Sequence, residues 1–314
     1  MRNCGPSYNR GMTSSAIQSS ARQTFLAGLA IAIVGAIFFS AKAIVAKLIY
    51  RYQVDAVTLI AFRMLFSLPF FAFVAIWKAR TAVPLSNSDR VRIVMLGLLG
   101  YYLSSFLDFL GLQYISAGLE RLILFLTPSF VLLISFFFLK KKISLVEWLA
   151  LGTAYLGTVL VLLHDARSGG ANVALGTALV LASAITYALY LLMSGELVAR
   201  VGAMRLVAYA MCVSSVACIV QFFLLRPPTE LLQPMPVYGL SMINAVFCTV
   251  LPVFLTMVAV ERIGAATTSQ AGMVGPVSTL FMGALILDEP ITAIQLAGTT
   301  LVLSGIYLLS KKKT

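Results

Sequence analysis

The sequence repeats itself after 148 residues without a gap, and this repeat constrains the fold more than any other feature. In the same register, Lys140-Lys141-Lys142 falls on Asp288-Glu289-Pro290, so equivalent loops carry opposite charge. The sequence therefore predicts two equivalent halves whose matching loops face different surroundings. The matched Pro, Gly and Ala pairs that set the register are Pro128/Pro276, Gly157/Gly305, Gly28/Gly176 and Ala117/Ala265.

The composition places the chain in a membrane. Apolar residues fill 60% of the 314 positions and charged residues only 11%, whereas soluble domains carry about 25% charged residues. The formal net charge of +12 could indicate a nucleic-acid partner, but the basic residues lie in short clusters between apolar runs. Such clusters are typical of topology determinants and of contacts to anionic lipid headgroups. We therefore expect lipid, and no nucleic acid, as a partner.

Ten apolar segments are long enough to span a bilayer, which takes about 20 residues each. Five spans per half is an odd number, so the second half must be inverted relative to the first, an arrangement typical of transporters. We expect a disordered cytoplasmic N-terminus at 1–24, a first repeat at 25–163 and a second, inverted repeat at 174–310. The predicted spans are 25–48, 56–77, 91–112, 117–139, 145–163, 174–197, 205–225, 237–260, 265–287 and 293–310.

The distribution of basic residues predicts the orientation. With the N-terminus inside, sixteen Lys and Arg residues fall on the cytoplasmic side and four on the other. Lys and Arg are retained on the cytoplasmic side of a membrane, so both termini are expected in the cytoplasm.

Five ionisable residues lie inside predicted spans, where a charge costs about 2.5–3.5 kcal/mol on insertion scales and marks a functional hypothesis. They fall within about 10 Å of the outer ends of their spans, at a rise of 1.5 Å per residue. The functional interpretation is a gate or substrate path that recognises a zwitterionic or anionic solute. The alternative is snorkelling of Lys42 and Arg63, with a structural ion pair elsewhere. The five residues are Lys42, Arg63, Asp108, Glu120 and Arg121.

This charged layer is confined to the first half. Glu120 and Arg121 align with Thr268 and Ser269 in the second copy. Because Glu120 and Arg121 are neighbours on a helix, their side chains diverge by about 100°, so at most one points squarely into a cavity.

A central cavity is expected around the two repeat prolines, because proline breaks a helix and frees carbonyls that are tolerated where they line a cavity. Each of the polar candidates nearby has packing or a helix–helix hydrogen bond as its alternative role. The candidate cavity-lining residues are Tyr102, Ser105, Pro128, Tyr190, Asn244, Gln270 and Pro276.

Few residues support other chemistry. The four cysteines show no metal-ligand spacing, and His164, the single histidine, is expected in a surface role beside Asp165 in a loop. The cysteine spacing and the single histidine give no reason to expect a metal site. No glycine-rich nucleotide loop is present either, so no other cofactor is expected. Asp288-Glu289-Pro290 has the composition of a helix N-terminus, at the start of the tenth span.

Several of these segments resemble the EamA family of the drug/metabolite transporter superfamily. The first-half matches are Phe62-Arg63, Lys47 at the end of the first span, and Gln113-Tyr114-Ile115-Ser116-Ala117 through Pro128. In the second half the matches are Ala265-Ala266 through Pro276, Asp288-Glu289-Pro290-Ile291-Thr292 and Gln295-Leu296-Ala297-Gly298. The resemblance covers about residues 25–310. The stretch Ala117-Gly118-Leu119-Glu120-Arg121 is more charged than the family pattern.

The resemblance implies a carrier of small organic metabolites in a bacterial inner membrane, exporting amino acids or related compounds through a central cavity. No covalent chemistry is expected, and the protein would act by alternating access or facilitated diffusion, as a monomer or a homodimer. Two alternatives remain: a membrane-embedded lipid-modifying enzyme and a non-transporting membrane scaffold. An enzyme of that kind needs acids or histidines clustered at a membrane face, and a sensor needs a soluble domain.

Overall fold

Apolar helices make up almost all of the described chain, because a helix satisfies its backbone hydrogen bonds within one segment where no water is available. The computed structural model describes residues 10–81, 84–140, 142–168 and 172–311, and no strand occurs among them. Within these ranges, nine helices are long and apolar enough to cross a membrane, and the shorter apolar helix Ala293–Leu309 is the tenth. The predicted all-α membrane protein with ten transmembrane helices is confirmed.

Spans three and four of the first half are interrupted, whereas the other three are single helices. The helix that holds the first span begins at Arg10, inside the segment for which the sequence predicts disorder, and the span itself is Arg22–Tyr50. The elements are α1 (Arg10–Tyr50), α2 (Ala56–Thr81), α3 (Asn87–Gly97), the π-helical turn η1 (Leu98–Leu103), α4 (Ser104–Leu112), α5 (Ala117–Phe125), α6 (Thr127–Leu139) and α7 (Leu145–Ser168).

The second half repeats this pattern of interruptions. The eighth span of the chain, which is the third of the second half, contains a second π-helical turn. The ninth span follows a break at Gly264, where φ is 79°. The elements are α8 (Val173–Val201), α9 (Ala203–Leu225), the short 3-10 turn η2 (Pro228–Leu231), α10 (Met235–Ala245), the π-helical turn η3 (Val246–Val250), α11 (Leu251–Ala271), α12 (Val274–Leu287) and α13 (Ala293–Lys311).

Local backbone geometry follows the 148-residue register. The π-helical turns begin at Leu98 and Val246, which are 148 positions apart. Lys140 and Asp288, separated by the same offset, both adopt left-handed conformations, with φ 52° and φ 62°, and end α6 and α12. Equivalent segments of the two halves therefore adopt the same local structure despite their opposite charge.

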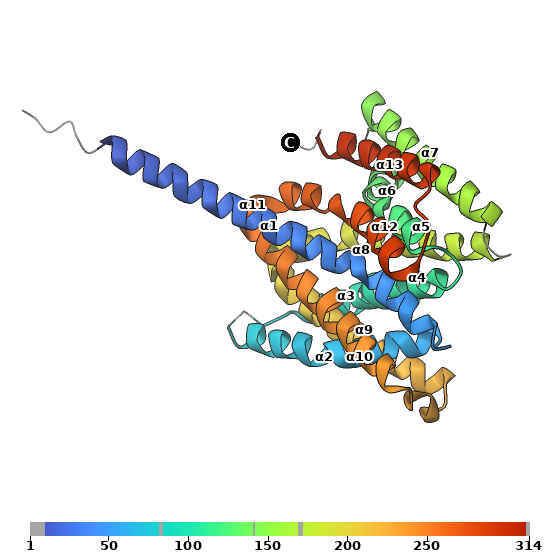
Figure 1. Ribbon diagram of the computed structural model, residues 1–314. Coiled ribbons are helices and arrows are strands. Elements are labelled where there is room, and N and C mark those ends of the chain that lie inside the picture. The colour runs from blue at the N-terminus through green and yellow to red at the C-terminus, as the bar shows by residue number, and fades with distance from the viewer. Residues whose placement is uncertain (1–9, 82–83, 141, 169–171, 312–314) are drawn as a thin grey trace, which may run out of the picture.

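Packing between the halves has two-fold symmetry. A Cβ on Gly157 would lie 2.6 Å from the carbonyl oxygen of Gly298, and one on Gly305 would lie 2.6 Å from that of Ala150, the repeat equivalent of Gly298. Because each contact recurs with the two halves exchanged, a pseudo-two-fold axis relates them, and α7 packs against α13 across it (Figure 1).

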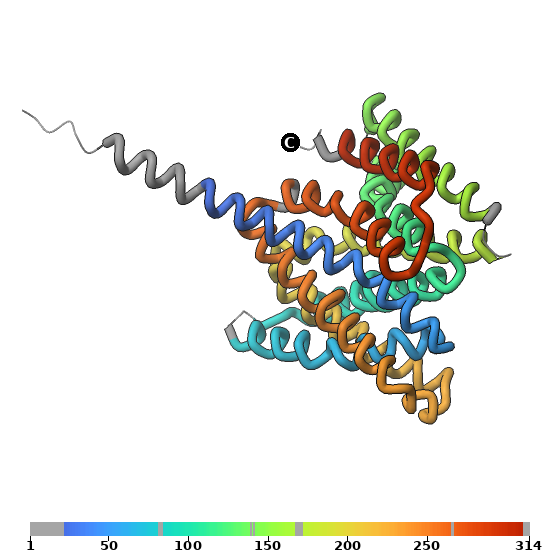
Figure 2. Tube along the Cα trace, viewed as in Figure 1, coloured from blue at the N-terminus to red at the C-terminus, as the bar shows by residue number. Residues whose placement is uncertain are grey.

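The same exchange relates a second pair of contacts. A Cβ on Gly28 of α1 would meet Ile263 of α11, and one on Gly176 of α8 would meet Ile115, the repeat equivalent of Ile263. Figure 2 shows α1 running along α11, each from a different half. The first span of each half thus packs on the third span of the other half, as an inverted duplication requires.

Two local predictions are wrong. Asp288 does not start a helix: it ends α12, and α13 begins only at Ala293, where Thr292 and Gln295 exchange hydrogen bonds as a capping box. His164 and Asp165 do not lie in a loop, because α7 continues to Ser168. In both places the helix boundary is set by capping and packing that the composition did not reveal.

Candidate functional site

The five predicted ionisable residues converge where four spans of the first half meet. Lys42 comes from α1, Arg63 from α2, Asp108 from α4, and Glu120 and Arg121 from α5. All five are buried, with at most 6% of any residue exposed. Lys42 and Arg63 therefore point into the protein and do not snorkel to a lipid interface. We call these five residues the charged cluster.

Lys42 is the centre of the charged cluster. Its Nζ lies 2.5 Å from Asp108 Oδ2 and 3.2 Å from Glu120 Oε1. The same ammonium lies 5.3 Å from the centre of the Phe109 ring and 5.5 Å from that of Phe39, within the range of cation–π attraction. One cation thus holds three helices together, and both acidic side chains of the cluster face it.

Arg63 connects the cluster to the second half. Its Nε donates to Thr249 Oγ1 at 2.8 Å, and its Nη1 donates to Ser105 Oγ at 3.4 Å. Thr249 lies in η3 and donates in turn to the Asn244 carbonyl at 2.9 Å. The π-helical turn therefore supplies the hydroxyl that orients Arg63, a role the sequence did not reveal. In the sequence, the signal that could have indicated this role is a polar residue, Thr249, inside an apolar span.

Arg121 forms no ion pair or hydrogen bond among the described residues, although Glu120 and Asp108 lie close enough to attract it. Its guanidinium lies 4.9 Å from the Phe39 ring centre, and its Nη2 lies only 2.6 Å from where a Cβ on Gly275 would sit. Gly275 comes from the first turn of α12, in the second half. Glu120 faces Lys42 while its neighbour Arg121 faces α12, as the divergence of adjacent helical side chains requires. In the sequence, this contact is indicated only by Gly275, a residue without a side chain that directly precedes Pro276.

Several polar atoms of this region are buried without a hydrogen-bond partner among the described residues. Apart from the ion pair with Lys42, both Glu120 carboxylate oxygens are in this state, and so is Asp108 Oδ1. Polar groups left unsatisfied in a dry interior are costly, so each needs an explanation such as a water molecule, an ion or a ligand. These atoms make the charged cluster a candidate binding site. The other such atoms here are Arg121 Nε and Asn244 Oδ1.

The structure brings only some of the predicted cavity-lining residues to the charged cluster. Ser105 contacts Arg63, and fully buried Asn244 donates through Nδ2 to the Lys42 carbonyl at 3.4 Å. Pro276 is buried next to Gly275, at the start of α12. Pro128 is exposed at the start of α6. Tyr102 and Gln270 are partly exposed and have no side-chain hydrogen bond to the cluster among the described residues.

Tyr190 belongs to a separate aromatic cluster. Its hydroxyl lies 3.2 Å from that of Tyr101, and its ring stacks on Tyr187 at 5.5 Å between centres. By the 148-residue offset these three residues are equivalent to Lys42, Thr249 and Phe39. The symmetry-related position of the charged cluster is therefore occupied by neutral aromatic groups, Tyr187 and Tyr190 from the second half and Tyr101 from the first.

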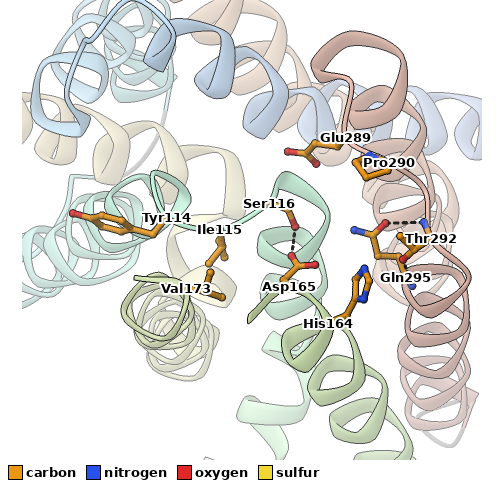
Figure 3. Close-up of a pocket in the computed structure, with 10 residues that line it drawn as sticks. All are labelled: Tyr114, Ile115, Ser116, His164, Asp165, Val173, Glu289, Pro290, Thr292 and Gln295. Carbon is orange, nitrogen blue, oxygen red and sulfur yellow. Dashed lines mark hydrogen bonds between the residues drawn. The ribbon is translucent and has the colours of Figure 1, made fainter. Parts of the chain in front are cut away.

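A pocket of about 180 Å³ lies where the loop between α4 and α5, the end of α7 and the loop between α12 and α13 meet (Figure 3). None of the residues of the charged cluster lines it. Ser116 donates to Asp165 Oδ2 at 2.6 Å, and the Ala117 amide donates to Glu289 Oε1 at 3.3 Å. Burial raises the pKa of Glu289 above its ordinary value of 4.5. The lining residues are Tyr114, Ile115, Ser116, His164, Asp165, Val173, Glu289, Pro290, Thr292 and Gln295.

The chain is similar to known transporters along almost its whole length. The EamA-like transporter family profile matches residues 26–163 and again residues 174–311. The uncharacterized transporter YcbK of Bacillus subtilis (strain 168) is 31% identical over 293 residues, which cover 90% of this chain and 91% of that protein. An uncharacterized transporter of Archaeoglobus fulgidus is 28% identical over 225 residues, covering 72% of this chain and 79% of that protein.

The fold is also found in a solved structure. A protein crystal structure superposes with a TM-score of 0.63 at 15% sequence identity, covering 91% of this chain and 98% of that one. At this identity the likeness concerns the fold alone. The duplicated family match and the relatives in two organisms settle the assignment: the chain belongs to the EamA-like transporter family.

Proposed function

We propose that this membrane transporter carries small organic metabolites, such as amino acids, through a path between its two halves. The observation that carries the proposal is the buried charged cluster, which contacts the second half through Thr249 and Gly275. Spans four and nine are both broken next to this contact, two to four residues before Pro128 and Pro276. Broken helices at the interface of inverted repeats are typical of substrate sites near the bilayer midplane.

Alternating access is supported by an asymmetry in the packing. Around the charged cluster, α1 contacts both α4 and α5. The equivalent pair in the second half, α8 and α11, is hardly in contact among the described residues. This arrangement fits a carrier closed at its charged end, and rocking of the halves would exchange the closed and open ends. A facilitated path would need only a smaller motion of the same elements.

The proposed orientation places both termini in the cytoplasm of a bacterial cell and the charged cluster toward the outer face of the inner membrane. The clusters of basic residues support this orientation. Export is the direction that the family resemblance implies. A fluorescent protein fused after Thr314 should fold and fluoresce, because it would remain in the cytoplasm.

The test is flux in liposomes that contain the purified protein. Radiolabelled amino acids and other metabolites are presented one at a time, with and without a pH gradient, and protein-free liposomes provide the background. Saturable flux of at least one solute supports the proposal, and dependence on the gradient would show proton coupling, for which Asp108 and Glu120 are the candidate residues. Absence of flux for every solute, with a lipid-modifying activity instead, would favour the membrane-embedded enzyme.

A further inference from the structure

Glu289 reaches from the second half to the start of α5 in the first half. Its Oε1 accepts a hydrogen bond from the Ala117 amide at 3.3 Å, and the Gly118 amide also interacts with its carboxyl group. The third amide of α5, that of Leu119, donates to Ser116 Oγ at 3.1 Å. The first amides of a helix have no partner within the helix. Two of the first three in α5 therefore rely on a residue of the other half.

Several elements meet at the Glu289 carboxyl group, which lines the pocket in Figure 3. The Glu289 amide donates to the Gly283 carbonyl at 3.2 Å, so the loop turns back over the end of α12. Lys47 of α1 attracts the carboxylate, whereas Asp165 of α7 repels it. Asp165 in turn accepts the hydrogen bond from the Ser116 hydroxyl at 2.6 Å. Glu289 is thus placed on α5 by contacts from both halves.

The Glu289 contact lies at the end of the bundle where the two broken spans meet. There α5 packs against α12, and a Cβ on Gly118 would lie 3.7 Å from Leu280 Cδ1. At the other end, the equivalent elements α11 and α6 are hardly in contact among the described residues. We call the α5–α12 contact the outer gate, after the proposed orientation. Because α5 carries Glu120 and Arg121, a movement at this gate moves part of the charged cluster.

The sequence provides no counterpart of this arrangement at the other end of the protein. The three residues that accept hydrogen bonds here, two acids and a serine, are replaced in the repeat by two lysines and a glycine. A lysine side chain has donors and no acceptor, and a glycine has no side chain, so neither can cap a helix N-terminus through its side chain. The equivalent pairs at the 148-residue offset are Glu289/Lys141, Asp165/Lys313 and Ser116/Gly264.

We propose that Glu289 latches the outer gate: its carboxyl oxygens hold the N-terminal end of α5 on the second half while the gate is closed, and release it when the gate opens. This inference rests on the proposed transport function and adds a positioning residue to it. Loss of a helix cap typically changes a conformational equilibrium about fivefold. Since only one end of the protein carries the acceptors, the latch favours the state in which the outer gate is closed.

The test is access to a thiol placed behind the outer gate. Leu280 of α12 faces Gly118 and is 8% exposed, so the thiol of Leu280→Cys is shielded while the gate is closed. A membrane-impermeant maleimide is added to spheroplasts that contain the full-length protein, and the labelling rate is measured. The chain with its four native cysteines alone gives the background. Adding Glu289→Ala to Leu280→Cys should raise the labelling rate about fivefold.

Three further variants separate the latch from a general loosening of the fold. Glu289→Gln keeps an oxygen acceptor at the same reach and should label at close to the rate of the parent. Glu289→Asp keeps the charge but has a shorter side chain, so it should label as fast as alanine; it decides the matter if Glu289→Ala does not fold. Glu230→Ala removes the acid of another loop, which contacts Thr58 of α2 at 3.1 Å, and should leave the rate unchanged.

The latch is overturned if neither Glu289→Ala nor Glu289→Asp labels faster than the parent, or if Glu289→Gln labels as fast as Glu289→Ala. It is also overturned if the rate rises only in inverted membrane vesicles, where the reagent reaches the other face of the membrane.

Transport and the latch can fail separately, because labelling requires no solute. If labelling follows the latch but no metabolite crosses the liposome membrane, the proposed function fails and the latch stands. If metabolites cross the membrane but Glu289→Ala leaves the labelling rate unchanged, the latch fails and the transporter proposal stands.

Discussion

Lys42 and Asp108 form an ion pair with 2.5 Å between Nζ and Oδ2, although they lie 66 positions apart and in different helices. Each residue is 4% exposed, so water screens this pair little. The same ammonium lies 3.2 Å from Glu120, which makes Lys42 the shared partner of two acids. Loss of Lys42 should therefore be more damaging than loss of either acid.

The variants Lys42→Met and Asp108→Asn test this unequal sharing. Lys42→Met removes the ion-pair partner of two buried carboxylates and should lower the free energy of unfolding by about 3–5 kcal/mol. Asp108→Asn should cost less, because Lys42 keeps its contact with Glu120. Denaturant unfolding in detergent measures both. Arg92→Met, which breaks an exposed pair, should cost at most about 1 kcal/mol. Equal costs for Lys42→Met and Asp108→Asn would contradict the shared-partner geometry.

The charged cluster should be required for flux. Arg63→Ala removes the connection to Thr249, and Glu120→Gln removes one of the two negative charges, so we expect each to abolish transport in proteoliposomes without preventing membrane insertion. Matched controls are Arg92→Ala and Glu196→Gln, which break an exposed ion pair at 3.3 Å and should retain wild-type flux. Unchanged flux in both cluster variants would remove the cluster from the mechanism.

The two-fold packing predicts equal effects from equivalent glycines. Alanine at Gly157 or at Gly305 places a Cβ 2.6 Å from a carbonyl oxygen across the α7–α13 contact. Each substitution should cost about 1–3 kcal/mol of stability, typical of overpacking. Gly152→Ala is the control, because a Cβ there meets no atom within 4 Å. Unfolding of the three variants under identical detergent conditions measures the costs; a large effect at only one glycine of the pair would argue against the symmetry.

Much of the fold could be predicted because the bilayer restricts what the chain can do. Spans must be apolar and helical, and an odd number of them in each half forces inversion. Pro128 and Pro276 marked the broken spans because proline cannot continue a helix undisturbed. Segment ends were less predictable: the capping box of Thr292 and Gln295, for example, lies beyond the Asp288 turn that resembled a helix start.

The site was predictable only as a layer of charges. Depth along each span placed the five ionisable residues at one level, but it could not say which acid pairs with which base. The Arg63–Thr249 contact joins residues 186 positions apart, and the Arg121–Gly275 contact crosses between halves. Such contacts depend on how each helix is rotated about its axis. Hydrophobic periodicity defines this rotation poorly when a helix is apolar on every side.

Glu289 offers a test of the pocket by pH. Burial raises the pKa of its carboxyl group above 4.5, so the folded protein favours the protonated form. A raised pKa in the folded state gives stability that is present below the ordinary pKa and is lost as the pH rises through the folded value. Glu289→Gln keeps an oxygen acceptor for the Ala117 amide but removes the charge. Relative to wild type, the variant should therefore gain thermal stability as the pH rises from about 4 to 8.

Unfolding midpoints across this range measure the effect, and Glu196→Gln, with 71% of the Glu196 side chain exposed, is the control. A difference between variant and wild type that stays constant with pH would show that Glu289 is ionised equally in both states.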